Sequence, residues 1–299
     1  MIMCKKRPSI LAIFSFILFM VASPLSQAQV SAIDYLGRTV TLEKPAQRIV
    51  ALAPHIVENI YSAGAGNLLV GAVEYCDYPE EAKKIPRVGA ISAYSLEAIV
   101  ALKPDLVVVW NSGHGGKTLP KLLDLGLKVY ASDPKTLDDI PRSIRDYGIL
   151  TGNSAYAEKK AAEFTQRHQL LKQQYSHPKA LRVFYQVWNQ PLQTLNDQHI
   201  ISDLIRLCGG TNVFGDAATV APVIGVEAVL IRDPDVIIAS GMGEERPEWL
   251  DDWRKYPSLK AVKKGDLYFV PPDIIQRHTV RMLEGAERVC HALEKSRNK

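Results

Sequence analysis

The sequence has few cysteines and no catalytic motif built around one. Four cysteines occur among its 299 residues, without a CxxC pair and without the Cys/His spacing of zinc ligands. A structural zinc site is therefore not expected. A Gly-x-Ser-x-Gly motif is absent as well, and Cys76 has no recognisable catalytic partner in the sequence. These absences argue against a hydrolase, so we expect a protein that is not an enzyme, with no catalytic residues and no catalytic cofactor.

An excess of charge of one sign is also lacking. The formal net charge is +4, and the three basic residues at positions 5–7 supply most of it, which leaves about +1 for the rest. Without a basic stripe, a nucleic-acid partner has no electrostatic support. The hydrophobic share of 47% suits a globular core and excludes disorder as the main state.

The apolar run near the N-terminus is too short for a membrane-spanning helix. It extends from Ser9 to Val21, whereas a transmembrane helix needs about 20 apolar residues. Basic residues precede the run, and Ser26-Gln27-Ala28 after it are small residues of the kind that a signal peptidase accepts. We therefore predict a cleaved signal peptide over residues 1–28 and a secreted, periplasmic mature chain that begins near Gln29.

Cleavage would leave an odd number of cysteines. Cys4 precedes the apolar run, so it does not occupy the position of a lipoprotein cysteine. Cys76, Cys208 and Cys290 remain, and an oxidising compartment allows one disulfide and one free thiol among them. The spacing alone does not indicate which two are paired.

Short β-type runs alternate with helix-type stretches, which predicts α/β units with parallel strands. Ser154 to Tyr175 contains neither Gly nor Pro and predicts one long, solvated helix, with Ser154 as its cap and His177-Pro178 as its end. A last amphipathic helix is expected from about Thr279 to Glu294. The predicted strands are Arg48–Leu52, Leu68–Val73, Leu106–Trp110, Lys128–Ala131, Arg182–Val187, Val236–Ser240 and Leu267–Val270.

The segments on either side of the long helix resemble each other. Ser95-Leu96-Glu97-Ala98-Ile99 leads to Pro104-Asp105 and a buried apolar strand. Gly225-Val226-Glu227-Ala228-Val229 leads to Pro234-Asp235 and a second such strand, at the same offset throughout. The alternative is a chance similarity between two ordinary helix–strand units, but the repeated order favours duplication.

This organisation predicts two Rossmann-like α/β lobes with parallel sheets, joined by one long backbone helix. We place the N-terminal lobe at residues 29–152, the connecting helix at 153–178 and the C-terminal lobe at 179–299. Ligands bind outside the carboxyl ends of parallel strands, so two facing lobes would enclose one ligand cleft between them. A single helical connection should limit hinge opening.

The segment Ser95 to Val107, SLEAIVALKPDLV, resembles the signature of the helical-backbone (class III) solute-binding proteins of ABC importers. These proteins carry ferric siderophores, haem and cobalamin. Tyr75-Cys76-Asp77-Tyr78-Pro79, Leu207-Cys208-Gly209-Gly210, and Asp273 with Arg277 make the chain most similar to the members that bind cobalamin. The resemblance covers nearly all of residues 45–295.

The resemblance implies a periplasmic protein that binds cobalamin (vitamin B12) or a related corrinoid and delivers it to a permease–ATPase complex in the inner membrane. A ferric siderophore or haem is the alternative ligand, and a monomer is expected. Glu97 and Glu227 match the two surface glutamates that engage arginines of the permease, although both could simply be solvated residues at helix starts. Cys208 and Cys290 match the family's disulfide, which leaves Cys76 as the extra thiol.

The resemblance also implies a set of ligand contacts. Tyr75, Trp110, Asp273 and Arg277 match positions that contact cobalamin in the relatives. Aromatic faces suit the flat surfaces of a corrinoid, and Asp and Arg suit its amide fringe and phosphate. Trp188 follows the first strand of the second lobe and should also line the cleft.

Two positions depart from the pattern of the relatives. Ile91 and Ala221 stand where those relatives carry tryptophan. This loss of aromatic surface indicates a rearranged cobalamin site, a weaker one or another ligand.

Two other constellations suggest different functions. Asn111 to Thr118, NSGHGGKT, nearly matches the phosphate-binding pattern GxxxxGK[ST], but Asn111 replaces the first glycine. A P-loop-like enzyme is therefore a remote alternative to a flexible loop at the mouth of the cleft. His55 and His114 both follow strands of the first lobe and raise the alternative of direct metal binding. Further ligands for a metal are not evident, so no metal site is predicted.

Overall fold

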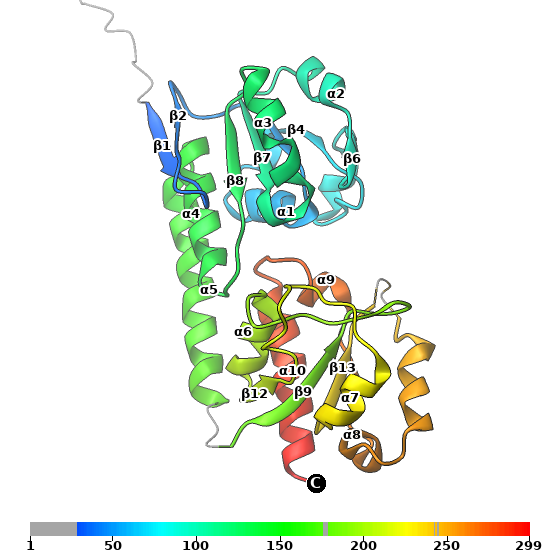
Figure 1. Cartoon of the computed structure of the whole chain (residues 1–299). Helices are drawn as coiled ribbons and strands as arrows, with labels where there is room; N and C mark the ends of the chain where they lie inside the picture. The colour runs from blue at the N-terminus through cyan, green and yellow to red at the C-terminus, as the bar shows by residue number, and fades with distance from the viewer. Residues whose placement is uncertain (1–28, 176–178, 242, 244) are drawn as a thin grey trace, which may run out of the picture.

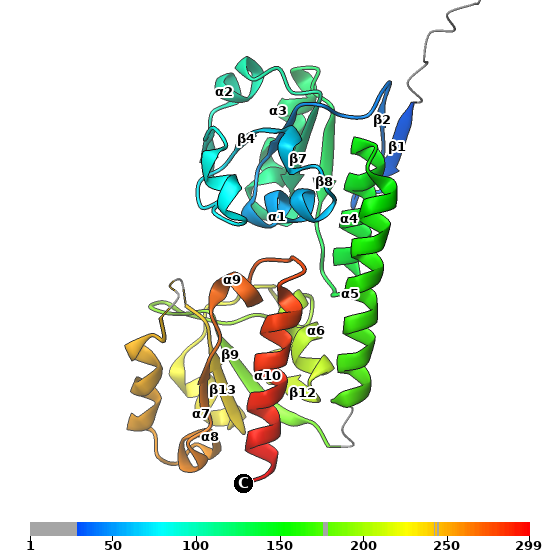
Figure 2. The same cartoon turned by 180° about the vertical axis from the view of Figure 1, so that it is seen from behind.

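The computed structural model describes residues 29–175, 179–241, 243 and 245–299. The predicted signal peptide at 1–28 and the predicted helix end at 177–178 lie outside the described residues. Figure 1 shows two α/β lobes stacked beside one long helix, and Figure 2 shows the same arrangement from behind. The predicted fold class is confirmed.

The N-terminal lobe contains a parallel sheet in the order β4-β3-β7-β8. Each predicted strand of this lobe is present, within one or two residues at its ends. The strands are β3 (Ile49–Ala51), β4 (Leu69–Ala72), β7 (Leu106–Trp110) and β8 (Val129–Ser132). The helices are α1 (Pro54–Ser62), α2 (Leu96–Ala101), α3 (Gly116–Asp124) and α4 (Asp139–Thr151), and β1 (Val30–Ile33) and β2 (Thr39–Leu42) form a hairpin ahead of them.

The C-terminal lobe repeats this topology in a sheet of order β12-β9-β13-β14. In both lobes the strands, numbered in chain order within the lobe, lie in the order second, first, third, fourth, as the predicted duplication would require. The strands are β9 (Leu181–Gln186), β12 (Gly210–Asn212), β13 (Val236–Ala239) and β14 (Leu267–Phe269). The helices are α6 (Ile200–Leu207), α7 (Val226–Arg232), α8 (Lys260–Lys264), α9 (Pro272–Ile275) and α10 (Met282–Arg297).

The connecting helix α5 spans Ser154–Gln174 and packs along α4. The prediction that Ser154 caps this helix is wrong, because Ser154 is already helical and the preceding Asn153 makes no side-chain cap bond. Gly148 allows the two helices to approach closely, since a Cβ at that position would lie 2.3 Å from the Cβ of Ala157. Among the described residues, no helix has both the length and the hydropathy needed to cross a bilayer.

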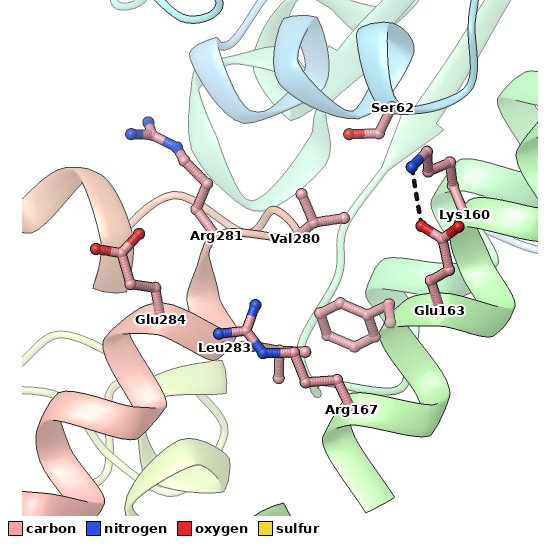
Figure 3. Close-up of a pocket in the computed structure, with 9 residues that line it drawn as sticks. Ser62, Lys160, Glu163, Arg167, Val280, Arg281, Leu283 and Glu284 are labelled. Atoms are coloured by element: carbon pink, nitrogen blue, oxygen red, sulfur yellow. Dashed lines mark hydrogen bonds and ion pairs between the residues drawn. The ribbon is translucent and has the colours of Figure 1, made fainter. Parts of the chain in front are cut away.

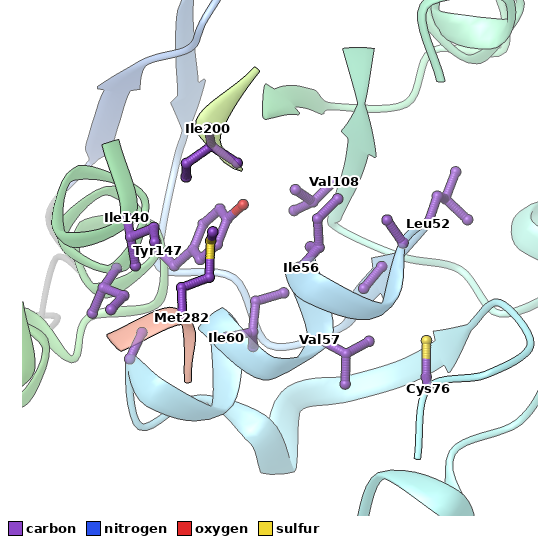
Figure 4. Packing of buried hydrophobic residues seen from close by; sticks show 14 of the residues in the cluster. Leu52, Ile56, Val57, Ile60, Cys76, Val108, Ile140, Tyr147, Ile200 and Met282 are labelled. Carbon is purple, nitrogen blue, oxygen red and sulfur yellow. The ribbon is translucent and has the colours of Figure 1, made fainter. Parts of the chain in front are cut away.

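Residues of both lobes share one hydrophobic core beside α5 (Figure 4). Ile56 and Ile60 of α1 and Tyr147 of α4 belong to it, as do Ile200 of α6 and Met282 of α10. Each of these side chains is at most 1% exposed. Separation of the lobes would expose this shared core to water, which gives a physical reason for limited hinge opening.

The disulfide between Cys208 and Cys290, expected from the family resemblance, is confirmed. It links the end of α6 to α10 within the C-terminal lobe. Cys76 is a buried free thiol, and burial raises its pKa to about 12. The predicted extra thiol is therefore not a reactive cysteine.

Candidate functional site

The loops after the carboxyl ends of the parallel strands lie where the two lobes face each other (Figures 1 and 2). In the N-terminal lobe these loops begin at Leu52, at Val73 and at Asn111. The segment around α9, which follows β14, faces them from the C-terminal lobe (Figure 1). This is the edge at which the sequence placed the ligand.

Arg277 bridges the two lobes. Its Nη1 donates to Oε1 of Glu58 at 3.1 Å and to Oδ1 of Asp77 at 2.7 Å, both in the N-terminal lobe. Its Nη2 lies 2.9 Å from Oδ1 of Asp273 in its own lobe. Burial by itself lowers the pKa of Arg277, but the carboxylates of Asp77, Asp273 and Glu58 outweigh it and raise that pKa. The guanidinium is therefore a permanent cation at the lobe interface.

Arg281 makes a second connection to the same carboxylate. Its Nε donates to Oε2 of Glu58 at 3.0 Å, and its Nη2 donates to Oε1 at 2.8 Å. The guanidinium also lies 4.0 Å from the ring centroid of Tyr78, in a cation–π contact. Glu58 is only 4% exposed, so two arginines of the opposite lobe compensate its buried charge.

The predicted contacts Asp273 and Arg277 thus lie together, and they already neutralise each other in part. A ligand phosphate that reached Arg277 would compete with Asp77, Glu58 and Asp273 for its donors. Arg277 therefore has a structural role between the lobes in addition to the predicted contact with a ligand.

Trp110 ends β7 and is half-buried at the lobe interface. Its ring centroid lies 5.3 Å from that of His55 and 6.0 Å from that of His278, and both contacts are edge-on. The segment after it, predicted from the sequence as a flexible loop, has a kinked and partly helical conformation. Asn111–Gly115 lead into α3 with a kink at Gly113, whose φ of −85° and ψ of −149° are not helical, and a Cβ at Gly113 would lie 2.4 Å from Cε3 of Trp110. Glycine therefore allows this segment to pack on the indole.

Tyr75 lies in the loop after β4, two residues before Asp77. Its side chain is 74% exposed, and its φ of 63° falls in the left-handed region that non-glycine residues rarely adopt. A strained, exposed aromatic residue beside an inter-lobe ion pair is compatible with the predicted ligand contact.

Trp188 is placed apart from the other predicted contacts. It lies in the short strand β10 (Trp188–Asn189), and its Nε1 donates to the carbonyl of Gln190 at 3.0 Å. Its ring meets Trp249 edge-on with centroids 6.4 Å apart. No contact joins Trp188 to Tyr75 or Trp110 in the part of the chain that the structure describes.

The two candidate docking residues occupy equivalent positions in the two lobes. Glu97 and Glu227 are exposed, and each lies in the first turn of its helix, α2 or α7. Hydrogen bonds from its own backbone N–H and from the Ser95 hydroxyl lower the pKa of Glu97. Gly225 stands at the position of Ser95 before α7, so Glu227 lacks the corresponding hydroxyl.

The two histidines of the metal-binding alternative do not meet. His55 packs against Trp110, whereas His114 packs against Tyr94 with ring centroids 5.5 Å apart. Across residues 29–175, 179–241, 243 and 245–299, no three His, Cys, Asp or Glu side chains are arranged to hold a metal ion. Direct metal binding therefore has no structural support.

A cavity of about 690 Å³ lies on the α5 side of the lobe interface (Figure 3). It contains none of the predicted ligand contacts. Its charged residues have partners of their own, such as Lys160 with Glu163 at 2.8 Å and Arg167 with Glu287 at 2.6 Å. We therefore do not assign the ligand to it. The lining residues are Ser62, Lys160, Glu163, Phe164, Arg167, Val280, Arg281, Leu283 and Glu284.

Several residues of the interface were missed from the sequence. Asp77 lies inside the segment that carries the family resemblance, and Arg281 lies four residues beyond Arg277, so both had a weak local signal. Glu58 had none, because its partner Arg277 is 219 residues away in the sequence.

Comparisons with known proteins agree with this architecture. The model of a family described as periplasmic binding proteins matches residues 49–274. A vitamin B12-binding protein of Vibrio cholerae is 37% identical over 250 residues, which cover 84% of this chain and 90% of that protein. A crystal structure of the periplasmic vitamin B12-binding protein of Vibrio cholerae matches with a TM-score of 0.79 and 36% identity, over 85% of this chain and 99% of that one. An apo periplasmic haem-binding protein from Roseiflexus sp. RS-1 matches with a TM-score of 0.74 at 22% identity, over 84% and 99% of the two chains, which supports the fold alone.

Proposed function

The chain belongs to the periplasmic binding protein family, and from this membership we propose that it captures cobalamin or a related corrinoid between its lobes and delivers it to an ABC permease. The assignment of the ligand is supported by the similarity, over most of both chains, to proteins named for vitamin B12 binding. These relatives are binding proteins and not enzymes, so the ligand leaves chemically unchanged. We place the protein in the periplasm after removal of residues 1–28, and its partner permease with its ATPase in the inner membrane.

The inter-lobe edge offers the chemistry that a corrinoid needs. Trp110 supplies a half-buried aromatic surface, and Tyr75 supplies an exposed one on the same lobe. Arg277 and Asp273 supply polar groups of both signs for the amide fringe and the phosphate. Trp188, with Trp249, would form a separate aromatic surface on the C-terminal lobe.

Titration of the purified mature protein with cyanocobalamin, by tryptophan quenching and calorimetry, tests the ligand. We expect one-to-one binding, and we expect Trp110→Ala to weaken it at least tenfold through loss of a central aromatic contact. Tyr156→Ala, which removes an aromatic side chain from the exposed face of α5, is the matched control and should bind like the wild type. Binding of a ferric siderophore or haem in place of cyanocobalamin would refute the proposed ligand but would leave the proposed transport function standing.

The two exposed glutamates are proposed to dock the loaded protein on the permease. Carboxylates at equivalent positions of duplicated lobes suit basic side chains on a partner with two similar halves, and they fix its register. We expect Glu97→Ala with Glu227→Ala to preserve cyanocobalamin affinity and to impair uptake by cells. Glu248→Ala removes an exposed glutamate elsewhere in the C-terminal lobe and should leave uptake intact. Loss of ligand affinity in the purified double variant would refute the docking role.

A further inference from the structure

Three histidines and Trp110 meet where the lobes join. His55 and Trp110 come from the N-terminal lobe, whereas His199 and His278 come from the C-terminal lobe. The ring centroids of His55 and His278 are 5.3 Å apart, and those of His199 and His278 are 5.4 Å apart. His55 is 5% exposed and His278 is 4% exposed. The three imidazoles therefore form a continuous series of tilted and edge-on ring contacts across the interface, and Trp110 meets His55 and His278 edge-on. We call these three rings the imidazole cluster.

The surroundings of the imidazole cluster favour the neutral form of each ring. Nδ1 of His199 accepts the N–H of Ile201 at 3.2 Å and caps α6, which requires that this nitrogen carry no proton. Burial lowers the pKa of His199 to about 4. Burial and the nearby charge of Arg277 lower the pKa of His55 to about 3, and burial beside the other two rings lowers the pKa of His278 well below 6.5.

The charged groups around the imidazole cluster do not compensate a positive charge on any of its three rings. From α1, Glu58 turns to Arg277 and Arg281, and Asn59 donates through Nδ2 to the carbonyl of His278 at 2.8 Å. Asp77 and Asp273 pair with Arg277. On α6, Asp203 accepts the backbone N–H of Leu137 at 2.9 Å.

Two nitrogens of the imidazole cluster have no hydrogen-bond partner in the described part of the chain. Among the described residues, Nε2 of His55 and Nδ1 of His278 have no hydrogen-bond partner, and none of the three rings has a carboxylate within ion-pair distance. A proton on either ring would therefore remain an uncompensated buried charge.

We propose that His55, His199 and His278 form an acid-sensitive joint that positions Trp110 and Arg277 for the ligand and that opens when the rings take up protons. A proton on Nδ1 of His199 would face the N–H of Ile201 and remove the cap of α6. A proton on His55 would place a second cation beside Arg277. The role in positioning rests on the proposed function, but the opening itself does not depend on which ligand is bound.

Proton linkage fixes the direction and the size of the effect. The joined lobes bind fewer protons than opened ones, because the folded pKa values lie below the ordinary value of 6.5. The joint is therefore fully stable above about pH 6.5 and weakens as the pH falls toward 4. A ring whose pKa returns to about 6.5 on opening favours the open state about tenfold at pH 5.5, and two such rings favour it about a hundredfold.

Small-angle X-ray scattering of the ligand-free mature protein between pH 7.5 and pH 4 tests the joint, with far-UV circular dichroism as the check of folding. We expect the radius of gyration of the wild type to rise below pH 6.5 while the dichroism stays native. In His55→Phe with His199→Asn the rise should shift to lower pH, because two titrating rings are gone. His199→Asn alone is the milder variant, since asparagine still caps a helix. Its equilibrium constant for opening at pH 5.5 should be about tenfold lower than that of the wild type.

The matched control is His291→Asn, which removes an exposed histidine of α10 and should leave the profile unchanged. Cyanocobalamin affinity measured over the same pH range should fall in parallel with the opening, and less so in the double variant. A wild-type radius that stays constant until the dichroism is lost would overturn the joint, as would variants with the wild-type profile. If the protein opens in acid but does not bind cyanocobalamin, the acid-sensitive joint is supported and the proposed ligand is refuted.

Discussion

Replacement of Glu58 by glutamine should loosen the lobe interface more than any comparable change of a surface carboxylate. Glu58→Gln keeps the shape of the side chain and removes its charge. Three hydrogen bonds from Arg277 and Arg281 end on this carboxylate, at 2.8 to 3.1 Å. The side chains of the two arginines are only 14% and 16% exposed, so water replaces the lost partner poorly.

The magnitude follows from the burial of the charges. Removal of one partner from a buried ion pair costs about 3–5 kcal/mol, because the other charge remains buried without compensation. Arg277 keeps Asp77 and Asp273 as partners, which places the expected loss at the lower end, about 3 kcal/mol. This loss corresponds to a change of roughly 150-fold in the equilibrium constant of unfolding.

Urea denaturation of the purified protein at pH 7.5 measures the loss, and Glu287→Gln is the control. Glu287 also connects two separate elements through an arginine, Arg167 of α5, but the two side chains are 44% and 49% exposed. An exposed pair contributes about 0–1 kcal/mol, so this variant should unfold almost like the wild type. Equal and small losses in both variants would refute the argument that burial makes the Glu58 cluster strong.

Two further predictions concern single features of the fold. Replacement of both Cys208 and Cys290 by serine should lower the free energy of unfolding by up to about 4.5 kcal/mol, because the disulfide closes a chain segment with a separation of 82 residues. Addition of a reductant to the wild type should have the same effect. An unchanged urea midpoint in both experiments would contradict the prediction. Gly89→Ala should cost about 1–3 kcal/mol, because Gly89 has a φ of +121° and a Cβ there would lie 2.7 Å from the carbonyl oxygen of Ala93. Gly126→Ala, with a φ of +76° and no atom within 4 Å of its Cβ, is the milder control, and an equal loss in thermal denaturation would show that the close contact is irrelevant.

The architecture was accessible from the sequence because its signals are local. Each of the seven predicted strands is present, and the long helix α5 has nearly the predicted bounds. Apolar runs such as Val107–Val109 have few alternatives once they are bounded by turn residues. Of the eight strands in the two parallel sheets, the one that was missed is β12, which consists of Gly210, Thr211 and Asn212. Its pairing with β9 comes from the neighbouring strand and not from its own composition.

The site was accessible only in part. Asp273 and Arg277 lie four residues apart, and the resemblance to a known family located them together. The conformation of the segment after Trp110 was not predicted, because a glycine-rich segment permits both an open loop and a tight kinked turn, and the close packing of Gly113 on the indole is not visible in the local sequence. No local pattern could reveal that Trp188 pairs with Trp249, 61 positions further along the chain.

Helix α1 shows most clearly why the lobe interface could not be derived from the sequence. His55, Glu58 and Asn59 are spaced i, i+3 and i+4, so they share one face of the helix, and a polar face normally indicates exposure to water. In the structure that face is buried, because His278, Arg277 and Arg281 of the other lobe cover it. The same polar stripe therefore supplies the ion pairs of Glu58, the buried hydrogen bond of the Asn59 side chain and one ring of the imidazole cluster, all of which join the lobes. Since these three contacts lie on one turn of one helix, opening at the imidazole joint would strain the Glu58 ion pairs as well, and acid should act on both together.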